Sequence, residues 1–580
     1  MDQEQLQQAR HSCAHLLAAA VRSIWPQALN AIGPAIESGF YQDFDMGDVT
    51  VSEADLPKIE EKMRELVKQW GPFQTMEVSV EQARKDFSYN KYKLELIEEF
   101  AEGGKKITEN DPGNFLDLCK GGHSGDPQKE LRHFKLLSLA GAYWRGSEKN
   151  KMLTRIYGTA WPTKDELMKH LNMIEEAKKR DHRKLGKEMG LFVFSDLVGS
   201  GMPLFTPKGA LVRSQIVQYS RDLNTKIGFG EVHTPNINKG ELFKISGHYD
   251  KYKDDMLMVK THYSDEEYFL KPMNCPQHTQ IYASSMRSFR DLPIRYSDFA
   301  NLYRDEQPGE LSGLTRLRSF CQDDGHCFCR EDQIAEEFSN VLGVIKEALA
   351  TYGLNYWIRL SLSDQKQPEK YLGDRDTWQK AEATLRELLK KNKVEHKEAI
   401  GEAAFYGPKM DIIAKDSLGR EWQISTIQLD LNMPARFGLK YIDSDGKEKT
   451  PVMIHRALVG SPERFMGILI EHFAGAFPVW LAPVQVALLP VSEKHVAGAQ
   501  KIAAEFRAAG IRVETDTADE TVGKKVRNAA KQKVPYIVVM GDRELEGGEW
   551  AVRVRGVEEQ LPIQKLDFIA RVQDEIKKRR

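Results

Sequence analysis

The chain has 580 residues, and its apolar, charged and aromatic fractions of 41%, 29% and 9% are ordinary for a globular protein. A net charge of −2 argues neither for nor against a nucleic-acid partner. No stretch approaches the roughly 18 apolar residues of a membrane span, and the N-terminus lacks the pattern of a signal peptide. We therefore expect several domains of roughly 100–200 residues each and no membrane association.

The cysteines are scattered along the chain instead of forming the dense framework of a small secreted protein. In a large chain, cysteines of this kind are typical of a reducing compartment, where they are buried, metal-bound or reactive. We expect a cytoplasmic protein.

Residues 1–160 form the first expected domain, which opens with a helical pattern because apolar residues recur on one side between Leu6 and Ile24. After Trp161, the pair Thr163 and Glu166 forms a capping box in front of another apolar stripe. That helix becomes strongly charged before it ends near Gly190. We expect residues 161–190 to form a solvated linker helix.

Residues 191–480 mix helices punctuated by glycine and proline with strand-like runs such as 452–454, and one helix is expected at 208–226. Residues 481–580 then alternate apolar strands at 484–491, 511–516 and 536–541 with helices at 493–509 and 522–531, followed by a final helix at 563–578. This alternation predicts a small, parallel-type α/β domain.

Cys275 lies in the proline-flanked segment 272–276, His326 ends the polar segment 322–326, and His455 lies in an apolar strand, where a polar side chain needs a partner. Their spacing matches no zinc finger, so spacing alone does not identify a site. Three nitrogen and sulfur ligands that leave one position open would suit a catalytic zinc ion.

A rival local cluster consists of Cys321, His326, Cys327 and Cys329. If residues 327–329 lie in a strand, the two thiols share one face and His326 points to the other. We rank this cluster lower, because such a strand cannot gather all four side chains around one ion.

A second constellation pairs His11 and His15, four residues apart on the first helix, with Cys119 and His123, which flank a glycine pair. Two histidines with a nearby cysteine and histidine could bind zinc, or could carry out hydrolysis at neutral pH. Two tight pairs of this kind favour a functional site over a polar cluster that caps a core.

Arginine motifs in residues 191–480 indicate a nucleotide site. Arg304 and Glu306 precede a glycine-containing loop, which is followed by Arg316 and Phe320, and Arg464 lies near the start of an apolar helix. Guanidinium groups are fixed donors for phosphates, and an aromatic ring together with an arginine can enclose a flat base. Neither a Walker loop nor a dinucleotide fingerprint is present.

Together with the segment 228–235, which follows the expected helix at 208–226, these motifs resemble motifs 1, 2 and 3 of class II aminoacyl-tRNA synthetases. Motif 1 ends at Pro235, motif 2 runs from Arg304 to Phe320, and motif 3 is centred on Arg464. The flanking strings at 273–276, 322–326, 404–409, 426–430 and 454–457 resemble those of threonyl-tRNA synthetases, in a form without the N-terminal ubiquitin-like domain. The resemblance implies a multidomain α+β and α/β protein. It implies an α+β editing domain at 1–160, an antiparallel class II catalytic core at 191–480 and an α/β anticodon-binding domain at 481–580.

The resemblance also implies the reaction. L-threonine and ATP, accompanied by Mg²⁺, would give threonyl-adenylate, and the threonyl group would pass to tRNA(Thr). Arg304 would hold the α-phosphate, Glu306 would read adenine, Phe320 and Arg464 would stack on it, and Arg316 would contact the outer phosphates. The further residues that the resemblance implies are Lys409 in catalysis, Gln423 and Ser461 in ATP binding, and Gln322, Asp324, Tyr406 and Gln428 in threonine binding.

The resemblance also implies two separate sites that distinguish threonine from similar amino acids. One zinc ion per subunit, bound by Cys275, His326 and His455, would reject valine, which lacks the hydroxyl of threonine. Serine differs by one methyl group, worth about 1–3 kcal/mol, which is too little for faithful translation. The resemblance therefore implies that an editing site hydrolyses mischarged Ser-tRNA(Thr). Its residues would be His11, His15, Lys93, Asp117, Cys119 and His123.

Arg553 and Arg555, on an expected strand at 551–555, are candidates for anticodon contacts, and resemblance in motif 1 implies a homodimer. The alternatives are a synthetase for another amino acid, a non-catalytic RNA-binding paralogue and a free-standing editing hydrolase. The metal-ligand triad argues against the first, the intact motif arginines against the second, and the length of the chain against the third.

Overall fold

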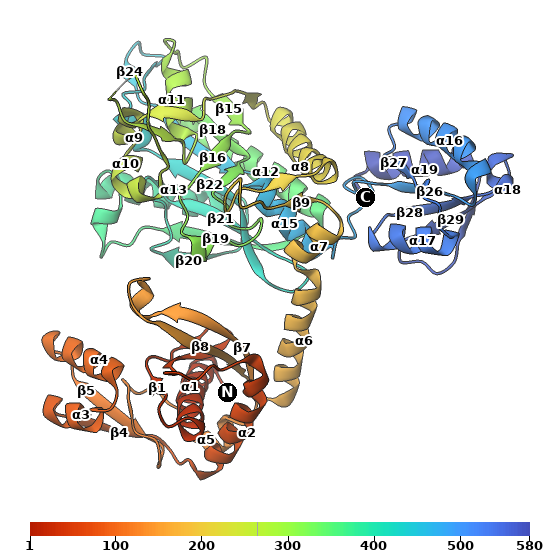
Figure 1. Cartoon of the computed structure of the whole chain (residues 1–580). Coiled ribbons are helices and arrows are strands. Elements are labelled where there is room, and N and C mark those ends of the chain that lie inside the picture. The colour runs from red at the N-terminus through yellow and green to blue at the C-terminus, as the bar shows by residue number, and fades with distance from the viewer. Residues whose placement is uncertain (264) are drawn as a thin grey trace. The chain divides into compact units, whose positions relative to one another are not determined.

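The computed structural model describes residues 1–263 and 265–580, and for Pro308 the backbone alone. The chain divides into two compact units, Met1–Glu175 and Glu176–Arg580 (Figure 1). Each unit is described by itself. None of the helices in the described residues combines the length and apolarity that a membrane crossing needs.

The central helix of the first unit is α1 (Gln3–Ile24), which confirms the expected opening helix. Asp2 caps it by accepting the backbone N–H of Gln5. Residues 12–21 are all buried. Small and apolar side chains on every side of this stretch let it pack against both a sheet and α2 (Leu56–Leu66).

Two sheets complete the first unit. The larger sheet has the order β1-β3-β8-β7, with β2 paired to β3. Its strands are β1 (Leu29–Asn30), β2 (Ala35–Ile36), β3 (Gly39–Asp45), β7 (Phe134–Tyr143) and β8 (Met152–Ala160). The smaller sheet consists of β4 (Gln74–Val78), β5 (Ile107–Asp111) and β6 (Asp117–Leu118), with α3 (Val80–Asp86) and α4 (Lys91–Glu102) packed on it. This is the expected α+β mixture.

The predicted capping box starts α6 (Lys164–Arg180), where Thr163 Oγ1 accepts the N–H of Glu166. The expectation of one helix up to Gly190 is wrong. Asp181 has non-helical backbone angles and caps a separate helix, α7 (His182–Glu188), by accepting the N–H of Arg183. A side chain that can cap a new helix therefore ends the first one.

An eight-stranded sheet forms the centre of the second unit, in the order β11-β15-β18-β25-β22-β21-β19-β20. The strands are β11 (Gly230–Glu231), β15 (Ile294–Asp298), β18 (Asp324–Cys329), β19 (Asn355–Leu362), β20 (His396–Ile400), β21 (Lys409–Lys415), β22 (Glu421–Asp430) and β25 (Val452–Ala457). All pairs are antiparallel except those at the two edges. The expected antiparallel core is thus observed.

The two faces of this sheet have different roles. Alternate residues such as Cys327, Ile427 and Ile454 belong to the main hydrophobic core. The core is shared with α8 (Pro207–Lys226), α12 (Ile334–Tyr352) and α15 (Pro462–His472), which lie together beside the sheet in Figure 1. Because side chains alternate along a strand, the residues between these point to the opposite face.

The last hundred residues contain a five-stranded sheet in the order β27-β26-β28-β29-β30. Its strands are β26 (Val486–Pro490), β27 (Val513–Thr515), β28 (Tyr536–Met540), β29 (Trp550–Val554) and β30 (Leu561–Ile563). The three expected helices are α16 (Val496–Ala508), α17 (Val522–Lys531) and α19 (Lys565–Lys577), close to their expected positions, and a short helix, α18 (Asp542–Leu545), follows β28. The sheet is mixed and not purely parallel, because β28, β29 and β30 follow one another as antiparallel strands.

Candidate functional site

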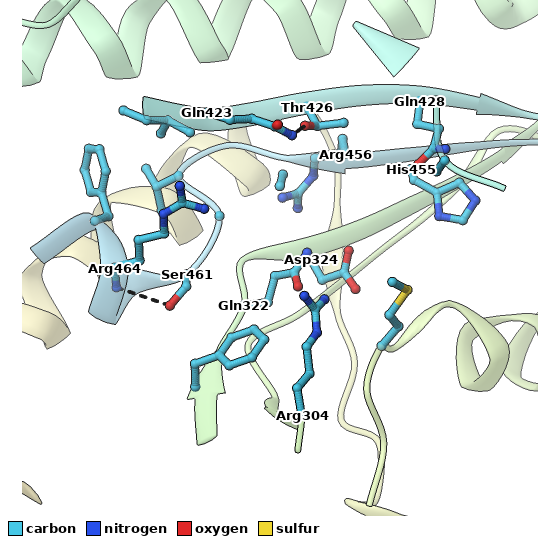
Figure 2. A pocket seen from close by; sticks show the side chains of 18 of the residues that line it. Arg304, Gln322, Asp324, Gln423, Thr426, Gln428, His455, Arg456, Ser461 and Arg464 are labelled. Carbon is cyan, nitrogen blue, oxygen red and sulfur yellow. Dashed lines mark hydrogen bonds between the residues drawn. The ribbon is translucent and has the colours of Figure 1, made fainter. Parts of the chain in front are cut away.

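A cavity of about 610 Å³ lies on the polar face of the eight-stranded sheet (Figure 2). It is lined by every residue that the sequence assigned to metal, ATP or threonine binding. These residues are Cys275, Arg304, Glu306, Arg316, Phe320, Gln322, Asp324, His326, Tyr406, Lys409, Gln423, Gln428, His455, Ser461 and Arg464. Strand register explains part of this convergence, because His326, His455, Gln428 and Lys409 are successive cross-strand neighbours in one row.

The predicted metal triad is assembled at this row. Cys275 is the first residue of α11 (Cys275–Ala283), and its ligand atom and those of His326 and His455 all lie within 4.8 Å of one another. All three residues are buried. Cys327 and Cys329 instead point into the core on the other face, so the rival local cluster is wrong.

The outer nitrogens of the two histidines are occupied by other side chains. His326 Nδ1 lies 2.7 Å from His278 Nδ1, and His455 Nε2 lies 3.0 Å from Asp430 Oδ2. The inner nitrogens, His326 Nε2 and His455 Nδ1, are 3.1 Å apart. This arrangement is usual around metal-binding histidines, since the outer partner fixes the tautomer and the ring orientation.

The protonation of the triad also suits a metal. Burial raises the pKa of the Cys275 thiol well above its usual value, and burial followed by the charges of neighbouring imidazoles lowers the pKa of His326. A neutral His326 is ready to ligate, whereas the thiol gives up its proton when a divalent cation binds. One sulfur and two nitrogen ligands with room for substrate are consistent with a zinc site.

The arginine motifs form the other part of the cavity. Arg304 directly follows β16 (Asn301–Tyr303), and its guanidinium lies 5.3 Å from the ring centroid of Phe320 in β17 (Ser319–Cys321). Arg316, in the loop between these strands, pairs with Glu306 at 2.7 Å and with Glu310 at 3.1 Å. For Arg316 to reach a phosphate, these ion pairs have to open.

Arg464 lies near the start of α15, where Gly460 has a φ of +66° and Ser461 Oγ accepts the Arg464 N–H at 3.3 Å (Figure 2). Its Nε is buried without a hydrogen-bond partner among the described residues. Burial, and then the positive charge of Arg304, lowers the pKa of Arg464. Two neighbouring guanidinium groups, one with an unused donor, give this part of the cavity the chemistry that an anion requires.

Asp411 is a functional candidate that the sequence analysis missed. Its carboxylate is fully buried on β21 and accepts from Lys409 Nζ at 2.9 Å, Gln423 Nε2 at 2.8 Å and Thr426 Oγ1 at 2.8 Å. Arg359 and Ser361 donate to it as well. Three of these donors line the cavity. A lone acid in the apolar run 410–414 was the available signal.

The remaining threonine-binding candidates have fixed orientations or protonation states. Gln428 Nε2 donates to the Gly407 carbonyl at 2.8 Å, so its amide cannot turn freely. Burial raises the pKa of Tyr406 well above its usual range, which keeps its hydroxyl a donor at neutral pH. Burial also raises the pKa of Asp324, which lies beside the metal triad in the cavity.

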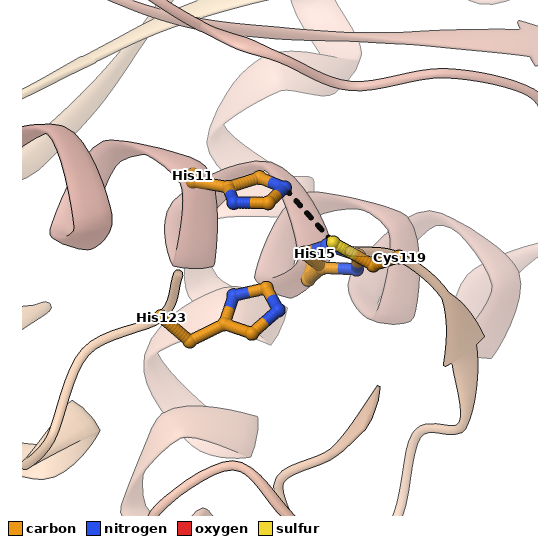
Figure 3. Close-up of side chains that lie close together, drawn as sticks. All are labelled: His11, His15, Cys119 and His123. Carbon is orange, nitrogen blue, oxygen red and sulfur yellow. Dashed lines mark hydrogen bonds between the residues drawn. The ribbon is translucent and has the colours of Figure 1, made fainter. Parts of the chain in front are cut away.

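The second constellation is assembled in the first unit. The side chains of His11, His15, Cys119 and His123 have ligand-type atoms within 4.8 Å of one another (Figure 3). His11 Nε2 lies 3.3 Å from Cys119 Sγ. Behind them, Asp117 is 2.9 Å from His15 Nδ1 and 2.6 Å from Lys93 Nζ, so all six predicted residues are gathered at one place.

Hydrogen bonding sets the charges of this cluster. Burial opposes ionisation of Cys119, but hydrogen bonds with His11, His123 and His15 lower the pKa of its thiol to about 3. Burial likewise works against a charged His15, yet its hydrogen bonds with Asp117 and Cys119 raise its pKa to about 9. Burial lowers the pKa of His123. At neutral pH the cluster therefore combines a thiolate, an imidazolium and a neutral imidazole.

The two arginines of β29 differ. Arg553 is exposed, whereas Arg555 donates to the carbonyls of Lys533 at 2.5 Å and Phe477 at 2.6 Å. Arg555 therefore holds backbone together, and Arg553 is the side chain with freedom to meet a ligand.

Two family models match the second unit, one over the region of the eight-stranded sheet and one over the region of the C-terminal sheet. The family model described as "tRNA synthetase class II core domain (G, H, P, S and T)" matches residues 258–473, and the "Anticodon binding domain" model matches residues 485–575.

Similar proteins extend the comparison to nearly the whole chain. A threonine–tRNA ligase of Thermotoga petrophila is 47% identical over 98% of this chain and 88% of its own length. One of Rubrobacter xylanophilus is 47% identical over 98% of this chain and 89% of its own length. The solved RNA-binding domain of threonyl-tRNA synthetase from Cryptosporidium parvum is 37% identical, covers 68% of this chain and 98% of that one, and superposes with a TM-score of 0.65. The sequence motifs, the assembled cavity and these similarities together show that the chain belongs to the threonine–tRNA ligase family of class II aminoacyl-tRNA synthetases.

Proposed function

We propose that this protein activates L-threonine with ATP, in the presence of Mg²⁺, and transfers the threonyl group to tRNA(Thr). The observation that carries the proposal is the single cavity that holds both a metal triad and a pair of arginines. Figure 2 shows His455 on one side of this cavity, Arg464 on the other and Arg304 between them. Such a site can hold an amino acid and a nucleotide next to each other.

In the first step the threonine carboxylate attacks the α-phosphorus of ATP and pyrophosphate leaves. Arg304 would hold the α-phosphate and balance the charge that develops there, and Lys409, fixed by Asp411, would add a second cation. Cations placed in advance act strongly in such a cavity because little solvent has to reorganise. Phe320 and Arg464 would enclose adenine, with Ser461 and Gln423 beside them.

Cys275, His326 and His455 would hold the zinc ion, which would supply an open coordination site for the amino and hydroxyl groups of the substrate. Asp324 would accept a hydrogen bond from the substrate hydroxyl, while Gln322, Tyr406 and Gln428 would orient the amino acid. A site that requires a hydroxyl leaves its own polar groups unpaired when valine enters, and it rejects valine on the order of 10⁴-fold.

The test is ATP–pyrophosphate exchange by the full chain with threonine, serine or valine, before and after removal of zinc. We expect exchange with threonine, weaker exchange with serine and almost none with valine. Exchange with proline or another class II amino acid in place of threonine would refute the assignment.

We also propose that the cluster around Cys119 removes serine from mischarged tRNA. The observation that carries this proposal is the convergence of His11, His15 and His123 on one thiolate, with Asp117 and Lys93 behind them. The neutral His123 can accept a proton from the attacking water, and the cationic His15 can stabilise the charge on the ester oxygen.

The editing test replaces His11 and His15 together by alanine. Hydrolysis of Ser-tRNA(Thr) should be lost while threonine-dependent exchange stays intact, and His133→Ala in the same unit serves as the control. The metal content of the first unit, expressed without the second, decides between metal-free hydrolysis and a zinc-assisted reaction. Unchanged hydrolysis in the double variant would contradict the assignment.

Three further parts of the proposal concern partners and location. Arg553 would contact the anticodon. A homodimer is supported by exposed apolar side chains on the hairpin of β9 (Phe192–Val193) and β10 (Leu204–Phe205), beside motif 1. These side chains are Val193, Phe194, Leu197, Val198 and Leu204. Six free cysteines fit a reducing cytoplasm. Light scattering tests the dimer.

A further inference from the structure

The first residue of α7 makes a contact with the ATP site that the motifs do not explain. His182 is buried between two walls of the cavity. On one side the Leu314 N–H, in the loop between β16 and β17, donates to His182 Nε2 at 2.9 Å. On the other side His182 Nδ1 lies 2.6 Å from Glu471 Oε1 in α15, and the His182 N–H donates to the same oxygen at 3.0 Å.

These partners fix the state of the imidazole. A backbone N–H can only donate, so His182 Nε2 carries no proton, and Nδ1 carries the proton that it donates to Glu471. The second oxygen of Glu471 accepts from Arg420. Asp181, His182 and Glu471 are close enough to resemble a metal site, but these contacts already use the imidazole and the Glu471 carboxylate. The group therefore acts as a structural bridge.

The bridge leaves little room for movement of the loop. Gly313 has a φ of +49°, and a Cβ placed on it would lie 2.2 Å from His182 Nε2. A Cβ placed on Gly467 of α15 would lie 3.2 Å from the Leu314 Cβ and 3.5 Å from the His182 ring. Leu314 is completely buried, two residues before Arg316, and both line the cavity. Glycines thus let the loop, α7 and α15 meet at the imidazole.

We infer that His182 is a positioning residue that joins motif 2 to motif 3, holding the loop of Leu314 and Arg316 against the ATP site through Glu471. The inference rests on the proposed function for the identity of the nucleotide, but the bridge itself is a feature of this fold. Without an acceptor at Nε2, the buried Leu314 N–H loses its partner, and the loop opens to satisfy it. ATP binding should then weaken, whereas threonine and zinc binding should not.

Two substitutions separate the two hydrogen bonds of the imidazole. In His182→Gln, the side-chain oxygen can take the place of Nε2 and still accept from Leu314. In His182→Asn, the shorter amide can take the place of Nδ1 and still donate to Glu471, but it cannot reach Leu314. A matched control is His495→Asn in the C-terminal sheet domain. That histidine is also buried and lies 3.1 Å from a carboxylate, that of Asp542.

Hydrogen exchange of the Leu314 amide and ATP–pyrophosphate exchange are measured on the zinc-loaded full chain. In His182→Asn we expect faster exchange at Leu314 and a KM for ATP raised about tenfold, the effect of one unsatisfied buried N–H. The KM for threonine and the zinc content should stay unchanged. In His182→Gln, the exchange rate of the Leu314 amide and the KM for ATP should both return most of the way to the values of the unmodified chain. Equal behaviour of the Asn and Gln variants, or unchanged exchange at Leu314 in His182→Asn, would overturn the inference.

Gly313→Ala provides an independent disturbance in case His182→Asn does not fold. It pushes the loop away from the imidazole without changing α7 or α15, and it should raise the KM for ATP in the same way. If the unmodified chain shows no threonine-dependent exchange, the proposed function fails. The Leu314 amide measurement still decides whether His182 holds the loop.

Discussion

Replacement of Asp411 by asparagine should disable the ATP site without changing the size of the side chain. One carboxylate oxygen accepts from Lys409, Arg359 and Ser361, and the other from Gln423 and Thr426. In asparagine an NH₂ group replaces one of these two oxygens. The side chains that donated to that oxygen then face another donor and lose their hydrogen bonds. The two cations also lose their only buried counter-charge in this network.

The size of the effect follows from these contacts. Each hydrogen bond to a charged group contributes about 1.5–3 kcal/mol, and Asp411→Asn removes at least two of them. If about 3 kcal/mol of that loss appears as misplacement of Lys409 and Gln423 in the transition state, kcat/KM for ATP falls on the order of 100-fold. The KM for threonine should change little, because the metal triad lies on β18, β25 and α11 and not on the strand of Asp411.

The assay is ATP–pyrophosphate exchange at varied ATP, with thermal unfolding measured in parallel. Glu337→Gln is the matched control, because Glu337 is also a buried carboxylate and accepts from Arg295 at 2.6 and 2.7 Å away from the cavity. Both variants should melt earlier, but only Asp411→Asn should lose activity. A kcat/KM for Asp411→Asn within about twofold of the unmodified chain would refute the reasoning.

Three other predictions concern separate parts of the chain. Cys275→Ser should weaken zinc binding by more than about 100-fold and abolish threonine-dependent exchange, as followed by chelator competition; retained zinc would rule out the triad. Because the thiol pKa of Cys119 is about 3, it should react with iodoacetamide as fast at pH 5 as at pH 8. An ordinary thiol would slow on the order of 1,000-fold over that interval, and peptide mass spectrometry distinguishes the two results. Arg553→Ala should weaken tRNA binding about tenfold at unchanged stability, whereas Arg555→Ala should lower the melting temperature and leave tRNA affinity intact; the opposite pattern would contradict the assignment.

Local sequence determined the helices well, because periodicity and caps act over a few residues. Helix α6 starts directly after Thr163, as its capping box with Glu166 predicts, and the expected helix at 522–531 has the bounds of α17. The expectation of one continuous helix up to Gly190 was wrong for an equally local reason. The charged sequence around Asp181 is compatible with a helix, but Asp181 caps a new one. The sequence pattern did not predict the direction of every strand, and the C-terminal sheet, which was expected to be parallel, is mixed.

The sequence showed which residues could bind a metal or a phosphate, but not which of them lie close together in space. Motif resemblance named Cys275, His326 and His455 although 51 and 129 residues separate successive members, and the strand register then showed why two of them meet. Without the motifs their spacing would have indicated nothing.

What only the tertiary structure decided are the contacts that carry no motif of their own. Asp411 is an unremarkable acid in the sequence, yet five donors converge on it once β19, β21 and β22 are paired. In the sequence His182 is one polar residue within a charged linker, yet it bridges Leu314 and Glu471, which lie 132 and 289 residues further along the chain. Sequence patterns report local conformation and burial, whereas a buried polar group acquires its role from whichever distant partners the fold places within hydrogen-bond distance.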